Sequence, residues 1–421
     1  MIPQQHSASA AVRAGSGDGA ASAAFSLQDL PASFYDDPYP TYRALQENDP
    51  VHRMPDGTLF LTRYRDLEAI YKDTVRFSSD KKVEFAPKYG VGSRLFEHHT
   101  TSLVFNDPPL HTRVRHLIAG ALSPRAIAEM EPGLTELVDR LLDRIQSRGE
   151  VDLIEDFAAA IPVEVIGNLL NIPHEERGPL RGWSLAILGA LEPVLSDEVQ
   201  QGGERAVADF LDYLRRLVAD RRRRPGDPEH DVLTRLIAGE SDGGHRLSEV
   251  ELLQNCIFIL NAGHETTTNL IGNGLELLLR YPGERQRLID DPALIRTAIE
   301  EFLRFESSNQ LGNRRVVEAA EIGGTAVAEG TLVTLCIGAA NRDPEQFAAA
   351  DRLDVGRTPN RHLAFASGPH VCAGLNLARL EGRVAIGRFL ARFPAFTAAA
   401  PGRRARRARF RGFVALPARL A

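Results

Sequence analysis

Apolar residues recur at helical spacing through the middle of the chain, from Ser123 to Ala238, and prolines interrupt the pattern. A longer helix is predicted next, because Ser248-Glu-Val-Glu251 has the form of a capping box and a long apolar run follows it. We expect that helix to extend to Leu279, since Pro282 lies just beyond. The pattern therefore predicts a series of helices with one long member.

Strand patterns are short and few. Val51–Arg53 and Thr58–Thr62 are predicted to form a hairpin, because Pro55-Asp56-Gly57 between them is a turn signal. A third β-rich run covers Val333–Ile337. Residues 81–102 combine mixed charge and glycine without a clear period, which predicts a long loop. Long loops in compact domains are usually functional, so we expect this one to lie near a site.

One stretch, Phe365 to Gly374, places Cys372 among glycines and directly before a helix-forming run. A thiolate there would lie at a helix N-terminus, where free N–H groups and the helix dipole favour negative charge. His370 could reach an anionic group, and Phe365 could exclude water from the sulfur. Two alternatives are a buried, inert cysteine and a nucleophilic cysteine assisted by His370.

Three other sets of residues have spacings that suggest specific roles. His111 and Arg115 are four residues apart, so on a helix they share one face and suit an anion. Ala262-Gly263-His264-Glu265-Thr266 interrupts the long apolar helix with residues of weak helix propensity, which indicates a functional reason. Glu301 and Arg304 place opposite charges on one helix face.

Together these motifs resemble the cytochrome P450 family, in order and spacing. Phe365-x-x-Gly-x-His-x-Cys-x-Gly374 is similar to the haem-thiolate loop, with one departure, Ala366, where bacterial members usually carry glycine. The resemblance implies a mainly α chain with a small β region, the cytochrome P450 fold. It implies one catalytic domain over 25–421, preceded by a segment, 1–24, that we expect to be disordered because it is rich in Ala, Ser and Gly.

The resemblance also assigns roles. Haem b would be the cofactor and Cys372 the ligand of its iron, within a loop that includes Phe365 and Gly374. The haem propionates would be held by four basic side chains: His111, Arg115, Arg314 and His370. Ala262 and Gly263 would leave room for dioxygen, while Glu265 and Thr266 would deliver protons. Glu301, Arg304 and Arg357 would form a structural triad.

The amino-acid composition limits which partners the chain is expected to bind. The net charge of −6 argues against general nucleic-acid binding, and no run of about 20 apolar residues predicts a membrane span. The chain has three cysteines: Cys256, Cys336 and Cys372. This number is too small for a disulfide framework, which fits a cytoplasmic protein, and it is also too small for an iron–sulfur cluster. Electrons would then come from a separate ferredoxin and ferredoxin reductase, docking near Arg113 and Arg379. We expect a monomer.

The resemblance implies a monooxygenase that hydroxylates a C–H bond of a small polar substrate in secondary metabolism. Ser308 and Asn309 replace the usual proline and valine beside the haem, so Asn309 and Gln310 are predicted to contact the substrate. Phe413 is predicted to do so as well, because Phe410 to Pro417 resembles the family's C-terminal hairpin, whose tip reaches the substrate pocket. The phrase around Asn309 resembles P450s that β-hydroxylate amino acids bound to peptidyl carrier proteins of nonribosomal synthetases. Alternatives are a free terpenoid or polyketide as substrate, a fatty-acid peroxygenase, and a non-catalytic haem sensor.

Overall fold

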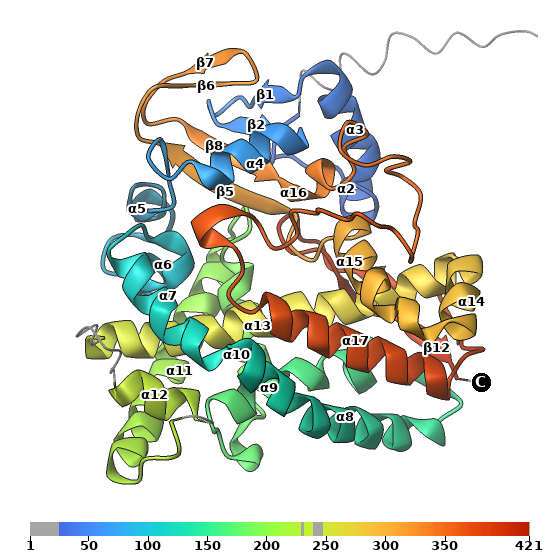
Figure 1. Ribbon diagram of the computed structural model, residues 1–421. Coiled ribbons are helices and arrows are strands. Elements are labelled where there is room, and N and C mark those ends of the chain that lie inside the picture. The colour runs from blue at the N-terminus through green and yellow to red at the C-terminus, as the bar shows by residue number, and fades with distance from the viewer. Residues whose placement is uncertain (1–24, 229–230, 239–246, 421) are drawn as a thin grey trace, which may run out of the picture.

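A 32-residue helix, α13 (Glu249–Arg280), crosses the middle of the molecule and organises the helices around it (Figure 1). This computed structural model describes residues 25–228, 231–238 and 247–420. The predicted capping box is confirmed, because the Ser248 side chain accepts from the Glu251 N–H and the Glu251 side chain accepts from the Ser248 N–H. The segment 1–24, predicted to be disordered, lies outside the described residues.

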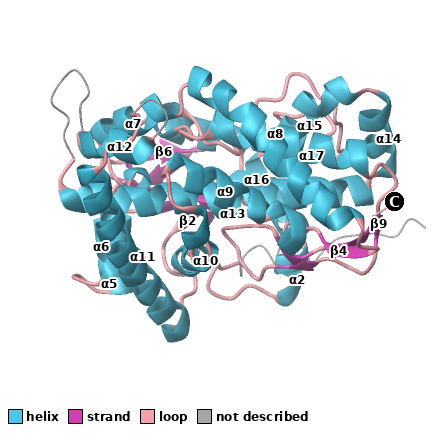
Figure 2. Cartoon of the chain, turned by 90° about the horizontal axis from the view of Figure 1, so that it is seen from below, coloured by secondary structure: helices cyan, strands magenta, loops and turns pink. Residues whose placement is uncertain are grey.

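Helices make up most of the described chain, and Figure 2 shows them surrounding α13. Their bounds are α2 Ala32–Asp36, α3 Tyr39–Asn48, α4 Tyr64–Lys72, α5 Lys82–Tyr89, α6 Arg94–Thr101, α7 Leu110–Ala121, α8 Pro124–Gln146, α9 Ala160–Leu169, α10 Leu180–Gly189, α11 Asp197–Arg223, α12 Val232–Ala238, α14 Pro282–Asp290, α15 Ile295–Phe305, α16 Ile337–Ala340 and α17 Leu375–Arg392. Short helical turns are η1 Leu103–Phe105, η2 Ile154–Ala158, η3 His174–Glu176, η4 Pro292–Leu294 and η5 Gly368–His370. None of the described helices combines the length and apolar character needed to cross a membrane.

The strands form one five-stranded sheet and three smaller ones. Their bounds are β1 Val51–Arg53, β2 Leu59–Leu61, β3 Phe77–Ser78, β4 Glu150–Asp152, β5 Leu311–Val316, β6 Ala320–Ile322, β7 Thr325–Val327, β8 Leu332–Cys336, β9 Thr397–Ala398, β10 Arg403–Arg404, β11 Phe413–Ala415 and β12 Pro417–Arg419. The main sheet has the order β1-β2-β8-β5-β3, with β2 and β8 parallel and the other neighbours antiparallel. The predicted β1–β2 hairpin and the predicted strand at β8 are confirmed.

The prediction of a long loop over residues 81–102 is wrong. This stretch forms α5 and α6, joined by a turn in which Gly90 and Gly92 have φ near +84° and +90°. Ser93 caps α6 by accepting from the Phe96 N–H. Phe85 is buried and packs against the ring of His99, so tertiary contacts stabilise helices too short to show a clear period.

A buried ion triad fixes the chain that leads to Cys372. Arg304 donates two hydrogen bonds of 2.8 Å to Glu301, and both side chains are fully buried. Arg357 donates to the same carboxylate at 3.1 Å, which confirms the predicted third member. Asn360 adds a further bond to Glu301, so the approach to the cysteine loop is anchored on α15.

Candidate haem site

Cys372 lies three residues before α17, where the sequence places it, and its side chain is exposed. The loop is closed locally, because the Cys372 N–H donates to the Phe365 carbonyl at 2.9 Å. Desolvation by the surrounding protein raises the pKa of the Cys372 thiol, while the Gly374 amide and the charges of Arg115 and Arg379 act to lower it. Space is open at Gly374, two residues after the cysteine, because a Cβ there would meet nothing within 4 Å.

Two residues of this loop have left-handed backbone. Gly368 has φ +68°, and a Cβ there would lie 2.3 Å from the Tyr71 carbonyl oxygen, so only glycine fits. Ala366 has φ +57° although it is not glycine. Such a conformation costs an L-residue about 1–3 kcal/mol, which explains why glycine is usual at this position and why alanine is still tolerated.

Basic side chains from three elements gather around His370. The His111 ring from α7 lies 4.0 Å from that of His370, centroid to centroid, and Arg115 donates to the Val371 carbonyl at 2.8 Å. Burial, together with the charges of Arg314, His111, Arg115 and Lys81, lowers the pKa of His370 to about 3. The predicted propionate-binding residues are thus brought together, although Arg314 comes from β5, far along the chain.

This donor set fits haem. His111 is 3% exposed, and neither its Nε2 nor the Nζ of the buried Lys81 has a hydrogen-bond partner within the part of the chain that the structure describes. A buried donor without an acceptor is costly, so these groups call for an anion such as a propionate. The exposed thiol of Cys372 supplies an iron ligand on the same loop as His370.

The middle of α13 is open where the sequence predicted a groove. Ala262 is exposed and Thr266 is half-buried, although most of this helix is buried. The Thr266 hydroxyl donates to the Ala262 carbonyl at 2.6 Å. Gly263 lies close to α9, because a Cβ there would lie 2.2 Å from Ile166 Cδ1. That glycine permits close packing of α13 on α9, and its role in leaving room for dioxygen stays a prediction.

Glu265 has a partner that the sequence analysis missed. The Nη1 of Arg407 donates to both carboxylate oxygens, at 2.5 and 2.6 Å, and its Nη2 donates to the Leu185 carbonyl at 3.0 Å. Burial raises the pKa of Glu265 to about 7 although Arg407 lowers it. Arg407 lies in the turn between β10 and β11, so the cluster of six arginines from 403 to 411 was the only signal in the sequence.

Two of the three predicted substrate contacts are wrong. Gln310 is 1% exposed, its amide donates to the Ser307 carbonyl, and its Oε1 would contact a Cβ at Gly338, so it packs in the core. Phe413 lies under the Arg404 guanidinium, at 4.1 Å, and lines a cleft of about 800 Å³. Asn309 remains a candidate, since it is half-buried and its Oδ1 has no partner.

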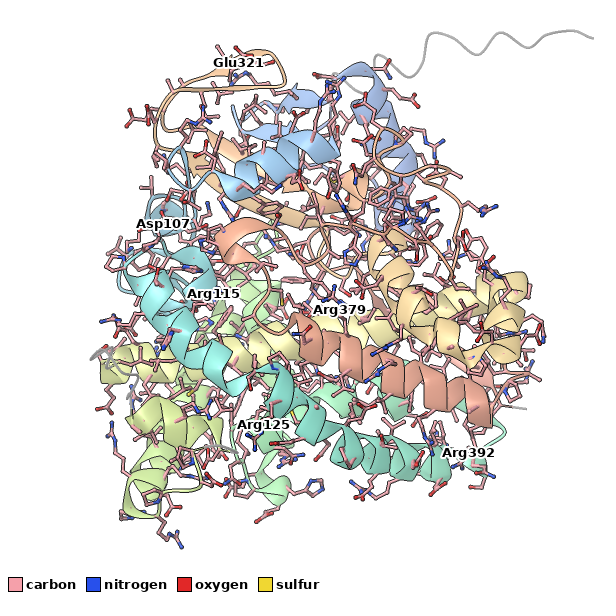
Figure 3. The ribbon with its side chains drawn as sticks, viewed as in Figure 1. Asp107, Arg115, Arg125, Glu321, Arg379 and Arg392 are labelled. Atoms are coloured by element: carbon pink, nitrogen blue, oxygen red, sulfur yellow. The ribbon has the colours of Figure 1, made fainter. Side chains whose placement is uncertain are left out.

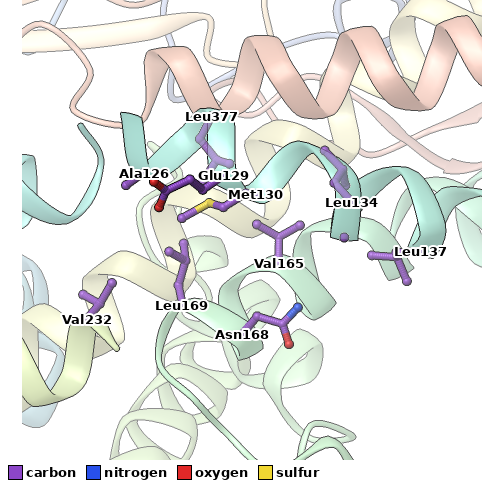
Figure 4. A pocket seen from close by; sticks show the side chains of 11 residues that line it. Ala126, Glu129, Met130, Leu134, Leu137, Val165, Asn168, Leu169, Val232 and Leu377 are labelled. Atoms are coloured by element: carbon purple, nitrogen blue, oxygen red, sulfur yellow. The ribbon is translucent and has the colours of Figure 1, made fainter. Parts of the chain in front are cut away.

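That cleft and a second pocket lie away from the cysteine loop. The cleft contains Tyr39 and Glu306, which are hydrogen-bonded to each other, and none of the predicted haem-binding residues. The pocket in Figure 4, of about 220 Å³, lies among α8, α9, α12 and α17. Its lining is mostly aliphatic, including Leu134 and Val165, and also contains none of the predicted site residues.

Comparisons with known proteins identify the family of this chain. The profile of the family described as Cytochrome P450 matches residues 186–400. Vitamin D(3) 25-hydroxylase of Pseudonocardia autotrophica is 38% identical over 86% of this chain and 88% of its own. The 6-deoxyerythronolide B hydroxylase of Saccharopolyspora erythraea is 36% identical over 87% and 91%.

Solved structures show the same fold. The structure of P450BioI in complex with acyl carrier protein carrying hexadec-9Z-enoic acid superposes with a TM-score of 0.87. It is 33% identical and the match covers 93% of this chain and all of that one. The predicted fold class is therefore confirmed. The chain belongs to the cytochrome P450 family, the monooxygenases that use haem b.

Proposed function

We propose that this monooxygenase hydroxylates a C–H bond, with Cys372 holding the haem iron and with Glu265 and Thr266 handling protons. Haem b held in this way supplies the activation of dioxygen. His111, Arg115, Arg314 and His370 would bind its propionates. The observation that carries the proposal is the open middle of α13, where a hydroxyl and a buried carboxyl are adjacent in sequence beside exposed Ala262.

The residues themselves suit proton handling. The Glu265 carboxyl has a pKa near 7, so it can exchange a proton near neutral pH. Thr266 can pass a proton through its hydroxyl, which already bonds the Ala262 carbonyl. Arg407 orients Glu265 by donating to both of its carboxylate oxygens.

Replacing Thr266 with alanine is expected to divert most reducing equivalents to peroxide. Without the Thr266 hydroxyl, protons would no longer be delivered to the position at which dioxygen is activated. The measurement is product formed per NADH oxidised, alongside peroxide release. Thr268→Ala is the matched control, since Thr268 makes the same type of bond, to the His264 carbonyl at 3.0 Å, but is buried. Unchanged coupling in Thr266→Ala would remove Thr266 from proton delivery.

Replacing Arg407 with glutamine is expected to move a pH inflection of the coupling upward from about 7. The guanidinium favours the ionised carboxylate of Glu265, so its loss leaves the protonated form populated to higher pH. Arg406→Gln is the control, because Arg406 lies in the same turn but is exposed, with its guanidinium 4.9 Å from the Tyr35 ring centroid. An inflection at the same pH in Arg407→Gln would contradict this role of the ion pair.

Members of this class take electrons from redox partners, and we propose a ferredoxin with its reductase. The predicted docking contribution of Arg113 and Arg379 has little support, because Arg113 pairs with Glu251 and Arg379 makes two 2.7 Å bonds to Glu300. Figure 3 places Arg379 on the face that also carries Arg115 and Arg125. Docking there would depend on shape as well as charge.

For the substrate, we propose an acyl or aminoacyl group presented by a carrier protein. Asn309, with its unpartnered Oδ1, calls for a polar group on the substrate. The similar P450BioI was solved with an acyl carrier protein, which makes this mode of presentation accessible to the fold. The arginines at 221–224 offer little for steering the carrier, since Arg221 pairs with Asp231 and Arg223 with Asp220.

The test compares four ligands by the shift of the haem spin state. These are a free amino acid, an aminoacyl carrier protein, a fatty-acyl carrier protein and a terpenoid. We expect tight binding of a carrier-bound ligand and weakened binding in Asn309→Val. Tight binding of the terpenoid without a response to either carrier protein would contradict the substrate proposal while leaving the family assignment intact.

A further inference from the structure

Lys81 is a buried lysine without a partner. Its side chain is 1% exposed, and its Nζ makes no hydrogen bond to the described residues. Lysine is almost never fully buried unless it is paired, because an ammonium group loses much hydration energy inside a protein. Here burial lowers the pKa of Lys81 to about 7. A bound anion beside the ammonium group would therefore stabilise Lys81 in this position.

The backbone brings Lys81 to the predicted haem-binding residues. It follows β3, whose Ser78 pairs with Arg315 on β5, the strand that also carries Arg314. Asp107, just before α7, accepts from the Ser79 N–H at 2.9 Å and from the Ser78 hydroxyl. These bonds tie the start of α7, which carries His111 and Arg115, to the segment that contains Lys81.

Among the described residues, two carboxylates, Glu84 and Asp107, act on this cluster, and they are fewer than its basic side chains. Glu84 favours the charged form of Lys81, but Glu84 is itself paired with Arg315 at 2.8 Å. Arg314 and Arg409 add positive charge near the ammonium. Arg314 is 7% exposed, and its guanidinium donates to the Asn313 carbonyl, lies over the Tyr71 ring and feels the charge of Asp107. The cluster therefore carries excess positive charge in a buried place, which suits a dicarboxylate.

We propose that Lys81 is a further haem-binding residue, which donates a charge-assisted hydrogen bond to a haem propionate beside Arg314. It would add a fifth basic side chain to the four predicted from the motifs. The inference rests on haem binding at Cys372 but not on the hydroxylation or on the substrate. Its test therefore measures haem retention and the reduction potential of the haem. These two properties can refute the proposal whether or not the protein hydroxylates a substrate.

The experiment compares Lys81→Met with Lys82→Met in the holoenzyme. Methionine keeps the length of the lysine stem and suits a buried site, whereas Lys82 is exposed and pairs with Asp80. Transfer of haem to excess apomyoglobin measures haem loss. Losing one charge-assisted hydrogen bond should speed haem loss about tenfold or more in Lys81→Met. Lys82→Met should match the unmodified protein.

The reduction potential of the haem provides a readout that a purely structural role would not move. Removing a nearby positive charge disfavours the reduced iron, so the potential of Lys81→Met should fall while that of Lys82→Met stays unchanged. Unchanged haem loss and potential in Lys81→Met would overturn the proposal. Weaker substrate binding with unchanged haem loss would also overturn it, because Lys81 would then face the substrate.

Discussion

Replacing Arg304 with methionine is expected to lower the free energy of unfolding by about 3–5 kcal/mol, because it breaks a fully buried ion pair. Glu301 would keep Arg357 and Asn360 but would lose two 2.8 Å bonds from Arg304. The Asn341 and Ala350 carbonyls would lose their donor as well. Urea unfolding followed by circular dichroism measures the change. Haem retention should fall with it, since the triad anchors the chain before the cysteine loop.

Arg215→Met is the control for this stability effect. Arg215 pairs with Asp212 on the exposed face of α11, at 2.7 Å, with both side chains more than half exposed. Exposed pairs contribute about 0–1 kcal/mol, so this variant should unfold almost as the unmodified protein does. Equal stability losses in the two variants would contradict the structural role of the triad.

Replacing Cys372 with serine is expected to abolish substrate hydroxylation. The thiolate gives electron density to the haem iron and so favours cleavage of the O–O bond, and a serine hydroxyl cannot substitute for it. His111, Arg115, Arg314 and His370 should still retain part of the haem, so the protein should remain coloured. The measurement is product formation per bound haem, with reconstituted redox partners.

Cys256→Ala is the control for this loss of activity. Cys256 is fully buried on α13, and burial raises the pKa of its thiol to about 12, so it is a packing residue. The control should keep hydroxylation per haem near that of the unmodified protein. Substantial hydroxylation by Cys372→Ser would remove Cys372 as the iron ligand.

Residues whose roles depend on short, fixed spacing could be predicted from the sequence. His111 and Arg115 share a helix face because four residues make about one turn, and Cys372 precedes α17 because the loop motif is contiguous with it. The capping box of α13 is equally local. The triad shows the limit of such reasoning, since Arg357 could be placed beside Glu301 only through the family resemblance.

Residues whose roles depend on contacts across the fold could not be predicted. Arg407 reaches Glu265 because the turn between β10 and β11 lies against α10, and no local pattern records this contact. Lys81 belongs to a stretch that the sequence predicts as a charged loop, whereas in the fold it follows the paired strand β3 and is buried. Buried charges of this kind are visible only after the chain has folded.

The wrong substrate contacts have a simple geometric reason. Successive side chains of an extended segment point to opposite sides, so Asn309 and Gln310 cannot both face the haem. Gln310 points into the core beside Gly338. Phe413 belongs to β11 of the C-terminal hairpin, whereas Arg407, which contacts Glu265, comes from the turn that precedes this strand.

The absorption spectrum of the reduced carbon monoxide complex tests the central claim most directly. If Cys372 ligates the haem iron as a thiolate, the purified protein will show the strongly red-shifted Soret band of this ligation, and Cys372→Ser will lack it. Cys256→Ala will keep the band. A purified protein without the red-shifted band, or a Cys372→Ser variant that retains it, would contradict the assignment of this chain as a haem-thiolate monooxygenase with Cys372 as ligand.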